Sequence, residues 1–264
     1  MKRTTFLIVS LLVGRSLAPG AAVGDPVSVR HAEGLVHGFL VLRSLDGTIL
    51  AHGDLIQMSH GSRVSSRLVF HFKDGSVQDE TAVFSQSGRF RLLTDHLVQR
   101  GPSFPHPQEV SIDAVQGRVT VKHRDNDGAE KIIDERMALP DDLANGLVLT
   151  LAKNIAPDAA ATTVSMVLAT PKPRLVKLVL TRAGDDRFSV AGGGSYKVTR
   201  FTAHIDIGGL AGLAAKLLGK QPPDASVWIL EGEAPGFVKS ENVFFQDGPV
   251  WRIELATPVP GRKP

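Results

Sequence analysis

Nine histidines are the side chains in this sequence best suited to bind a metal ion or to transfer a proton. None of them forms an HExxH pattern, and no pair lies four residues apart on an expected helix. Histidines on distant strands can still meet in a fold, so the sequence leaves such a site open without predicting it. We therefore expect no metal and no cofactor. The nine are His31, His37, His52, His60, His71, His96, His106, His123 and His204.

A second candidate for chemistry is the run Asp125-Asn126-Asp127-Gly128, which partly matches a calcium-binding loop. The two end positions of that loop would fall on His123 and Asp134, and neither is the residue the pattern requires. Aspartate and asparagine also favour tight turns because their side chains bond to their own backbone. We predict a hairpin turn here.

Acid–base chemistry is suggested by neighbouring reactive residues, but their spacing is unfavourable. Successive side chains on a strand point to opposite faces, so adjacent groups are badly placed for proton transfer. The sequence also lacks a GxSxG motif, and its Gly-rich run at 192–194 lacks the Lys-Ser/Thr and the helix of a phosphate loop. We expect a non-enzyme, with a hydrolase assembled from distant residues as an open alternative. The pairs concerned are Ser59-His60, Asp79-Glu80, Asp95-His96 and Asp134-Glu135.

The N-terminus predicts the compartment. Lys2 and Arg3 precede a short apolar run, Phe6–Val13, and a stretch of small residues, Ala18–Gly24, follows. This order is typical of a secretory signal peptide, and the apolar run is too short to span a bilayer. We predict a signal peptide over residues 1–24 and a single β-rich domain over residues 25–264, exported to the periplasm or the outside. An uncleaved membrane anchor is the alternative.

The charge balance follows from that cleavage. Removing the three basic residues of segment 1–24 from the 30 in the chain leaves 27, against 27 acidic residues. A mature chain of zero formal charge gives no support for nucleic-acid binding or for a polybasic membrane patch. The absence of cysteine excludes disulfides and thiol chemistry, so an exported domain must be held by its core.

Export can be tested directly. Because the apolar run is followed by small residues, protein produced in a Gram-negative host should begin near Val23 or Asp25. N-terminal sequencing measures this. Recovery of intact Met1 in the soluble cytoplasmic fraction would contradict the prediction.

Short β-rich runs separated by polar turns predict an antiparallel meander over most of residues 27–206. Asp-Gly pairs at Asp46-Gly47, Asp74-Gly75 and Asp127-Gly128 are strong hairpin signals, because glycine accepts a positive φ. Two segments break this rhythm and predict helices: Asp141–Asn154, where leucines recur at helical spacing, and Gly208–Gly219, which ends before Pro222-Pro223.

The C-terminal fifth carries both tryptophans and is the most distinctive part of the sequence. Its apolar residues predict the wall or the lid of a hollow that binds an apolar ligand. A helix packed permanently on the sheet, with its leucines in the core, is the alternative. The candidate ligand-binding residues are Leu210, Leu213, Leu217, Trp228, Phe237 and Trp251.

Two stretches carry a resemblance: LVFHFKDGSVQDETAVFSQSGRFRLLTDHLVQRGPSF and GGLAGLAAKLLGKQPPDASVWILEGEAPGFVKSENVFFQDGPVWRIEL. They resemble an uncharacterised family of bacterial exported β-rich proteins, which brings no activity. In layout alone, the chain is also similar to periplasmic half-barrels of the lipoprotein-carrier type. In those proteins a curved antiparallel sheet wraps over helices and holds acyl chains, and no binding residue carries over to this sequence.

Together these observations predict a mainly β protein: a curled antiparallel sheet, as an open or half barrel, with two packed helices. The expected function is binding or shuttling of a lipid or another apolar ligand, without nucleic acid and without a membrane span in the mature chain. A cell-envelope structural or interaction module with no cavity is the first alternative. The oligomeric state and the ligand are not predicted.

Overall fold

The computed structural model describes residues 26–125, 127–156, 158–170, 172–190, 194–209, 212 and 221–256. Within these ranges the chain forms fourteen strands and one helix. The N-terminal strands are β1 (Val36–Ser44), β2 (Ile49–His60), β3 (Arg63–Phe72), β4 (Val77–Ser87), β5 (Arg89–Arg100), β6 (Gln108–Asp113), β7 (Arg118–Arg124) and β8 (Glu130–Arg136). Helix α1 (Val148–Asn154) follows, and then β9 (Ala161–Thr170), β10 (Lys172–Val190), β11 (Gly194–Asp206), β12 (Ala225–Leu230), β13 (Gly236–Val243) and β14 (Val250–Leu255).

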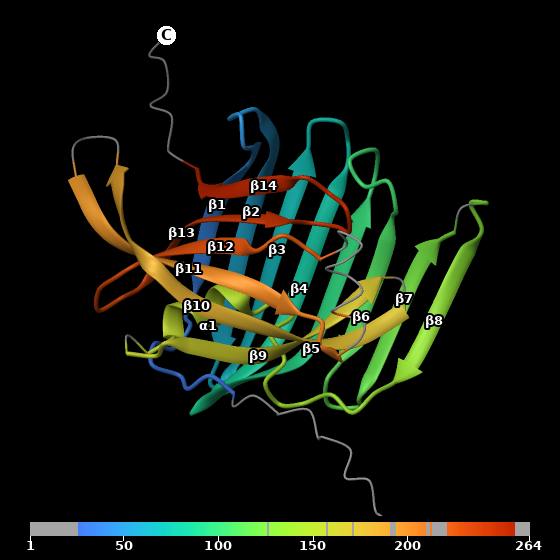
Figure 1. The fold of residues 1–264 in the computed structure, drawn as a ribbon, viewed down its shortest axis with the longest axis horizontal. Coiled ribbons are helices and arrows are strands. Elements are labelled where there is room, and N and C mark those ends of the chain that lie inside the picture. Colours follow the sequence, from blue (N-terminus) through green and yellow to red (C-terminus); the bar gives the residue numbers. More distant parts are fainter. Residues whose placement is uncertain are drawn as a thin grey trace, which may run out of the picture.

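All fourteen strands belong to one antiparallel sheet. Its order is β8-β7-β6-β5-β4-β3-β2-β1-β14-β13-β12-β11-β10-β9, so each strand pairs with its sequence neighbour except where β1 joins β14. The sheet folds back on itself, and β9–β14 lie across β1–β8 as a second layer (Figure 1). It is not closed, which confirms the predicted curled, open antiparallel sheet.

The predicted hairpin turns are confirmed where glycine sets them. Gly47, Gly75 and Gly128 each have a positive φ, of 95°, 85° and 83°, at the turns after β1, β3 and β7. The run 125–128 is thus part of the β7–β8 turn, where the Asp125 carbonyl accepts a hydrogen bond from the Gly128 N–H at 2.9 Å.

The helix prediction needs correction: the described residues contain one helix, not two. Helix α1 begins at Val148 rather than at Asp141. The residues before it instead bond to the outer edge of β9, where the Ala144 N–H donates to the Ser165 carbonyl and Asn145 bonds both backbone groups of Val167. Edge pairing therefore replaces helix over this stretch. The second predicted helix, Gly208–Gly219, falls mostly outside the described residues.

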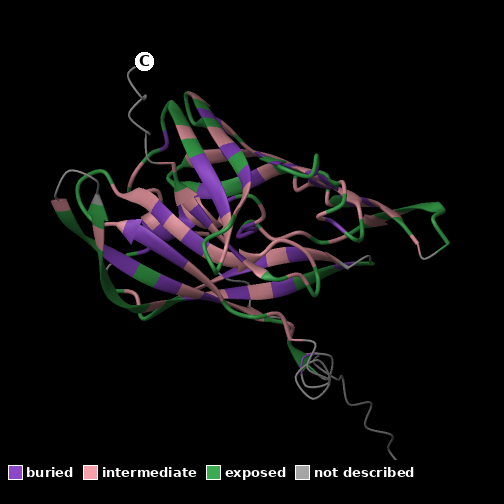
Figure 2. Ribbon diagram, turned by 90° about the horizontal axis from the view of Figure 1, so that it is seen from above, coloured by how far each residue is buried: buried purple, intermediate pink, exposed green. Residues whose placement is uncertain are grey.

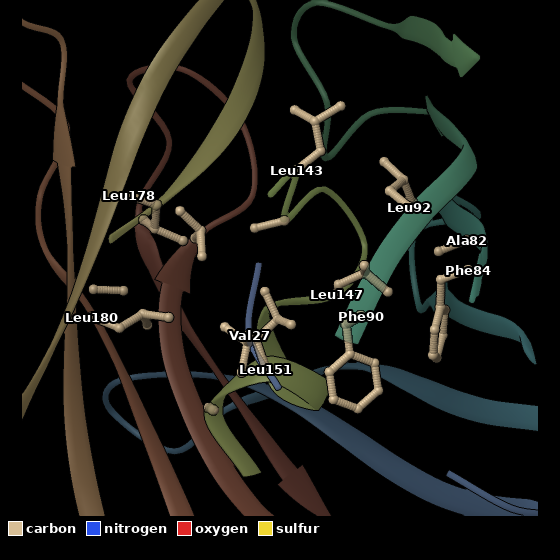
Figure 3. Close-up of a cluster of buried hydrophobic side chains, with 14 of the residues drawn as sticks. Val27, Ala82, Phe84, Phe90, Leu92, Leu143, Leu147, Leu151, Leu178 and Leu180 are labelled. Carbon is tan, nitrogen blue, oxygen red and sulfur yellow. The ribbon is translucent and has the colours of Figure 1, made fainter. Parts of the chain in front are cut away.

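The core lies between the two layers of the sheet. Leu143, Leu147 and Leu151 occupy the space between Leu178 and Leu180 of β10 on one side and the side chains of β4 and β5 on the other (Figure 3). Buried and exposed positions alternate along several strands (Figure 2). The buried apolar residues pack into clusters that make up the core. We call the face that packs on α1 the inner face and the opposite one the outer face. No helix among the described residues is long and apolar enough to span a bilayer.

Candidate functional site

The most unusual feature of the inner face is a polar belt, defined here as Gln78 and Glu80 of β4, Asp95 and Gln99 of β5, and Gln108 of β6. The belt separates the main core around α1 from a second apolar cluster built on β1–β3 and β14. Buried polar groups require bonding partners, and those without partners are candidates for function.

The three glutamines of the belt bond to one another. Gln99, which is 1% exposed, donates through Nε2 to Gln78 Oε1 at 2.8 Å and to the Phe244 carbonyl at 2.7 Å. Gln108 Nε2 donates to Gln99 Oε1 at 2.9 Å. Such a satisfied row fixes the positions of β4, β5 and β6 relative to the β13–β14 loop.

Glu80 and Asp95 lie on the same face as diagonal neighbours. Asp95 is directly opposite Ala82, two residues along β4 from Glu80. Diagonal neighbours on an antiparallel pair have Cα atoms about 7–8 Å apart, within electrostatic reach. Asp95 is 4% exposed and its Oδ1 has no hydrogen-bond partner, whereas Glu80 is only partly covered.

Among the described residues, neither Glu80 nor Asp95 has a Lys, Arg or His side chain as an ion-pair partner, in contrast to two other buried acids. The Glu33 carboxylate lies 2.5 Å from Lys153 Nζ and accepts from Gln57 Nε2 at 2.7 Å. The Asp142 carboxylate lies 3.7 Å from Lys177 Nζ. Burying a carboxylate without such a partner is costly, and the usual response is retention of the proton.

The pKa values agree with that expectation. Burial raises the pKa of the Glu80 carboxyl to about 7, from an ordinary value of 4.5. Burial also raises the pKa of Asp95 well above its ordinary value, and the charge of Glu80 adds to the rise. Near neutral pH the Glu80 carboxyl is therefore partly protonated. A neutral carboxyl can donate a hydrogen bond to a ligand oxygen.

A backbone strap, residues 142–147, covers Asp95. A Cβ placed on Gly146 would lie 2.6 Å from the Ala82 Cβ and 2.8 Å from Asp95 Oδ1. Gly146 also has a φ of 65°, so its backbone both requires glycine and passes directly over the acid. The strap explains why Asp95 is more deeply buried than Glu80.

Asp79 and His96, the sequence neighbours of Glu80 and Asp95, lie on the outer face, as strand alternation predicts. Asp79 accepts from Arg67 Nε at 2.9 Å, and His96 Nε2 lies 3.2 Å from Glu109 Oε1. The sequence pairs Asp79-Glu80 and Asp95-His96 are thus split between the two faces. The histidine that follows Asp95 cannot act as its catalytic partner.

An aromatic cluster borders the belt at Phe244, whose carbonyl accepts from Gln99. Its rings surround Trp251, with centroid distances of 5.2 Å to Phe244, 5.4 Å to Phe72 and 5.8 Å to Phe245. Phe237 is partly buried and packs against both this cluster and the main core. The members of the aromatic cluster are Phe70, Phe72, Phe104, Phe244, Phe245 and Trp251.

The other residues predicted from sequence do not join this cluster. Trp228 lies on the outer face, where its Nε1 donates to Asp186 at 2.7 Å and Lys239 Nζ lies 4.2 Å from its ring centre. It packs with Val198 and Val238 in a separate small cluster. Leu210, Leu213 and Leu217 lie outside the described residues, so the predicted lid is not placed.

Two hollows on the described surface have several charged residues in their lining. One, of about 290 Å³, is bordered by Glu33, Lys153 and Glu233 near the end of α1. The other is an open groove along the β10–β11 hairpin, lined by Asp185, Lys197 and neighbouring polar residues. In the groove, Lys197 Nζ forms an ion pair with Asp185 at 3.0 Å. In the smaller hollow, Lys153 Nζ forms an ion pair with Glu33 at 2.5 Å.

Comparison with known proteins gives a distant structural likeness and no family assignment. No protein-family model matches the chain, and no curated protein matches it. A solved structure that it resembles is a β-barrel-like protein of the domain of unknown function DUF1849, from Brucella abortus. The two share 10% identity over 86% of this chain and 98% of that chain, with a TM-score of 0.45. This chain is a mainly antiparallel β protein with one large, unclosed sheet.

Proposed function

We propose that the protein is an exported binding protein for an apolar or amphipathic ligand, such as a lipid or an acylated molecule, held on the inner face. The observation that carries this proposal is the position of the uncompensated acid pair beside the aromatic cluster. Ligand sites are mostly apolar, with a few polar groups that fix the orientation of the ligand. Trp251 and Phe237 would form the apolar wall, and Glu80 would contact the polar end.

Neutral carboxyls suit this role better than ionised ones. A protonated Glu80 donates to an ester, hydroxyl or phosphate oxygen, which is the chemistry of a lipid head region. The partial exposure of Glu80 supports contact with a ligand, because the fully covered Asp95 cannot be reached without moving the strap. Asp95 would then act indirectly, by keeping a proton on the pair.

The two tryptophans provide a matched test, since Trp251 is on the inner face and Trp228 is on the outer face. Trp228→Phe leaves Trp251 as the only tryptophan, and Trp251→Phe leaves Trp228. Dibromostearate quenches a tryptophan that it touches. We expect saturable quenching in Trp228→Phe and little in Trp251→Phe, measured by fluorescence titration below the concentration at which the fatty acid forms micelles.

Unbrominated stearate is the control, since it should bind without quenching and should compete with the brominated form. Equal quenching of both variants would indicate non-specific adsorption. No quenching of either would reject the binding function and favour a second candidate, a structural or interaction module of the cell envelope. The filling of the space between the two sheet layers by Leu143, Leu147 and Leu151 supports that alternative.

A further inference from the structure

The outer face of β2 and β3 brings two histidines together. His52 and His71 are directly opposite each other in the antiparallel register. They are 19 positions apart in the sequence, which is why spacing alone did not pair them. Both are exposed, and both belong to the face opposite the buried Ala51 and Phe72.

We propose that His52 and His71 form a bidentate site for a divalent transition-metal ion such as Cu²⁺, Ni²⁺ or Zn²⁺. Directly opposed residues on an antiparallel pair have Cβ atoms about 4.5–5.5 Å apart, so two imidazoles can reach one ion between them. Imidazole nitrogen is a preferred ligand of these metals, and water completes the coordination shell. Hard cations such as Mg²⁺ prefer oxygen and are excluded.

The backbone under the pair is well suited to hold it. β2 and β3 pair without a register shift from Ala51–Phe72 to His60–Arg63, so the two side chains are presented by a continuous ladder. The flanking positions opposite the pair are Val41 on β1 and Val77 on β4, which supply no competing charge. The imidazoles therefore start on rigid neighbouring strands, which lowers the ordering cost of chelation.

Two other histidines of this face lie against carboxylates. His37 Nε2 lies 3.3 Å from Asp54 Oδ1, and His96 Nε2 lies 3.2 Å from Glu109 Oε1. His96 is opposite Thr81 and Ser111, not a second histidine. Among the described residues no group of three or more such ligands is close enough to hold an ion. The opposed pair is thus the arrangement on this face that offers two nitrogens at once.

The test is a calorimetric titration of the whole protein with CuSO₄ and with NiSO₄, at a slightly alkaline pH where histidine is neutral. We expect one equivalent of metal to bind to the wild type. His52→Gln and His71→Gln should each weaken that binding by at least about tenfold, because one imidazole holds these ions far less well than two. Electron paramagnetic resonance of the Cu²⁺ complex should show two nitrogen ligands.

His96→Gln is the matched control, since it removes an exposed histidine from the same face without touching the pair. It should bind metal like the wild type, and MgCl₂ should give no binding to any variant. The proposal is overturned if His52→Gln binds Cu²⁺ as tightly as the wild type, or if His96→Gln weakens binding as much as His71→Gln. Exposed glutamines on a strand rarely affect folding, and circular dichroism of each variant checks this.

Discussion

Glu80→Gln is expected to stabilise the protein at about pH 8 by up to about 3 kcal/mol and to have little effect near pH 4. The folded pKa of Glu80 is about 7, above its ordinary value of 4.5, so the folded state binds more protons than the unfolded state between these values. The free energy of unfolding of the wild type should therefore fall as the pH rises through this window. Glutamine carries no such penalty. Urea unfolding at a series of pH values measures the difference.

Glu109→Gln is the control on the outer face. Hydrogen bonds from Lys122 and His96 lower the pKa of Glu109, so its ionised form stabilises the fold and its replacement should slightly destabilise the protein at the same alkaline pH. The two substitutions therefore have opposite expected signs. Parallel pH curves for wild type and Glu80→Gln would show that Glu80 is solvated in the folded state, and would also remove the polar end of the proposed ligand site.

Gly146→Ala is expected to destabilise the protein by about 3 kcal/mol, compared with about 1 kcal/mol for Gly61→Ala. The two glycines have similar φ values, 65° and 61°, so the backbone strain of the alanine is matched. A Cβ on Gly61 meets no atom within 4 Å, whereas one on Gly146 meets the Ala82 Cβ at 2.6 Å. The difference isolates the contact of the strap with β4 and β5. Chemical unfolding of both variants measures it, and equal losses would mean that the strap does not rest on Asp95.

The meander was predictable because its signals are local. Three Asp-Gly pairs mark the β1–β2, β3–β4 and β7–β8 turns, and short alternating runs mark the strands. The curvature of the sheet and the pairing of β1 with β14 were not predictable in the same way, because they depend on contacts between residues about 200 positions apart. The start of α1 is not predictable for a related reason. Leucine spacing indicates a helix from Asp141, but the residues of the strap form hydrogen bonds with the edge of β9, which is distant in sequence.

The acid pair illustrates how one irregular residue hides a site from sequence reading. A regular hairpin from the Ser87–Arg89 turn would pair Thr81 with Asp95 and turn the acid outward. The register instead shifts between Val83 and Phe84, so Asp95 pairs with Ala82 and points inward. A bulge of this kind reverses every side chain beyond it. Phe90 and Leu92 before the shift, and Asp95 and Gln99 after it, are consequently all buried.

Of the candidate ligand-binding residues, only the three aromatic ones lie in the described part of the chain. Trp251 and Phe237 contact the inner clusters, and their role in binding a ligand stays a prediction. Its position in the C-terminal fifth groups Trp228 with them, but strand alternation places it on the face opposite Val227 and Ile229. Sequence spacing relates Glu80 and Asp95 only to their neighbours Asp79 and His96, and it carries no signal of their proximity across β4 and β5.

The joint between β1 and β14 also has a consequence for how the chain folds. Leu40 pairs with Leu255, and Ser44 pairs with Trp251, so the middle of the sheet is completed by β14, the last of the described strands along the chain. Loops of this length are slow to close, because the entropy of the intervening chain is lost before the contact forms. Until then β1 exposes an unpaired edge with Leu40 and Leu42 beside it, a surface that promotes association with other chains. During folding in a cell, pairing of β1 with β14 therefore competes with association of the open β1 edge with other chains. A chaperone that covers β1 would favour the pairing.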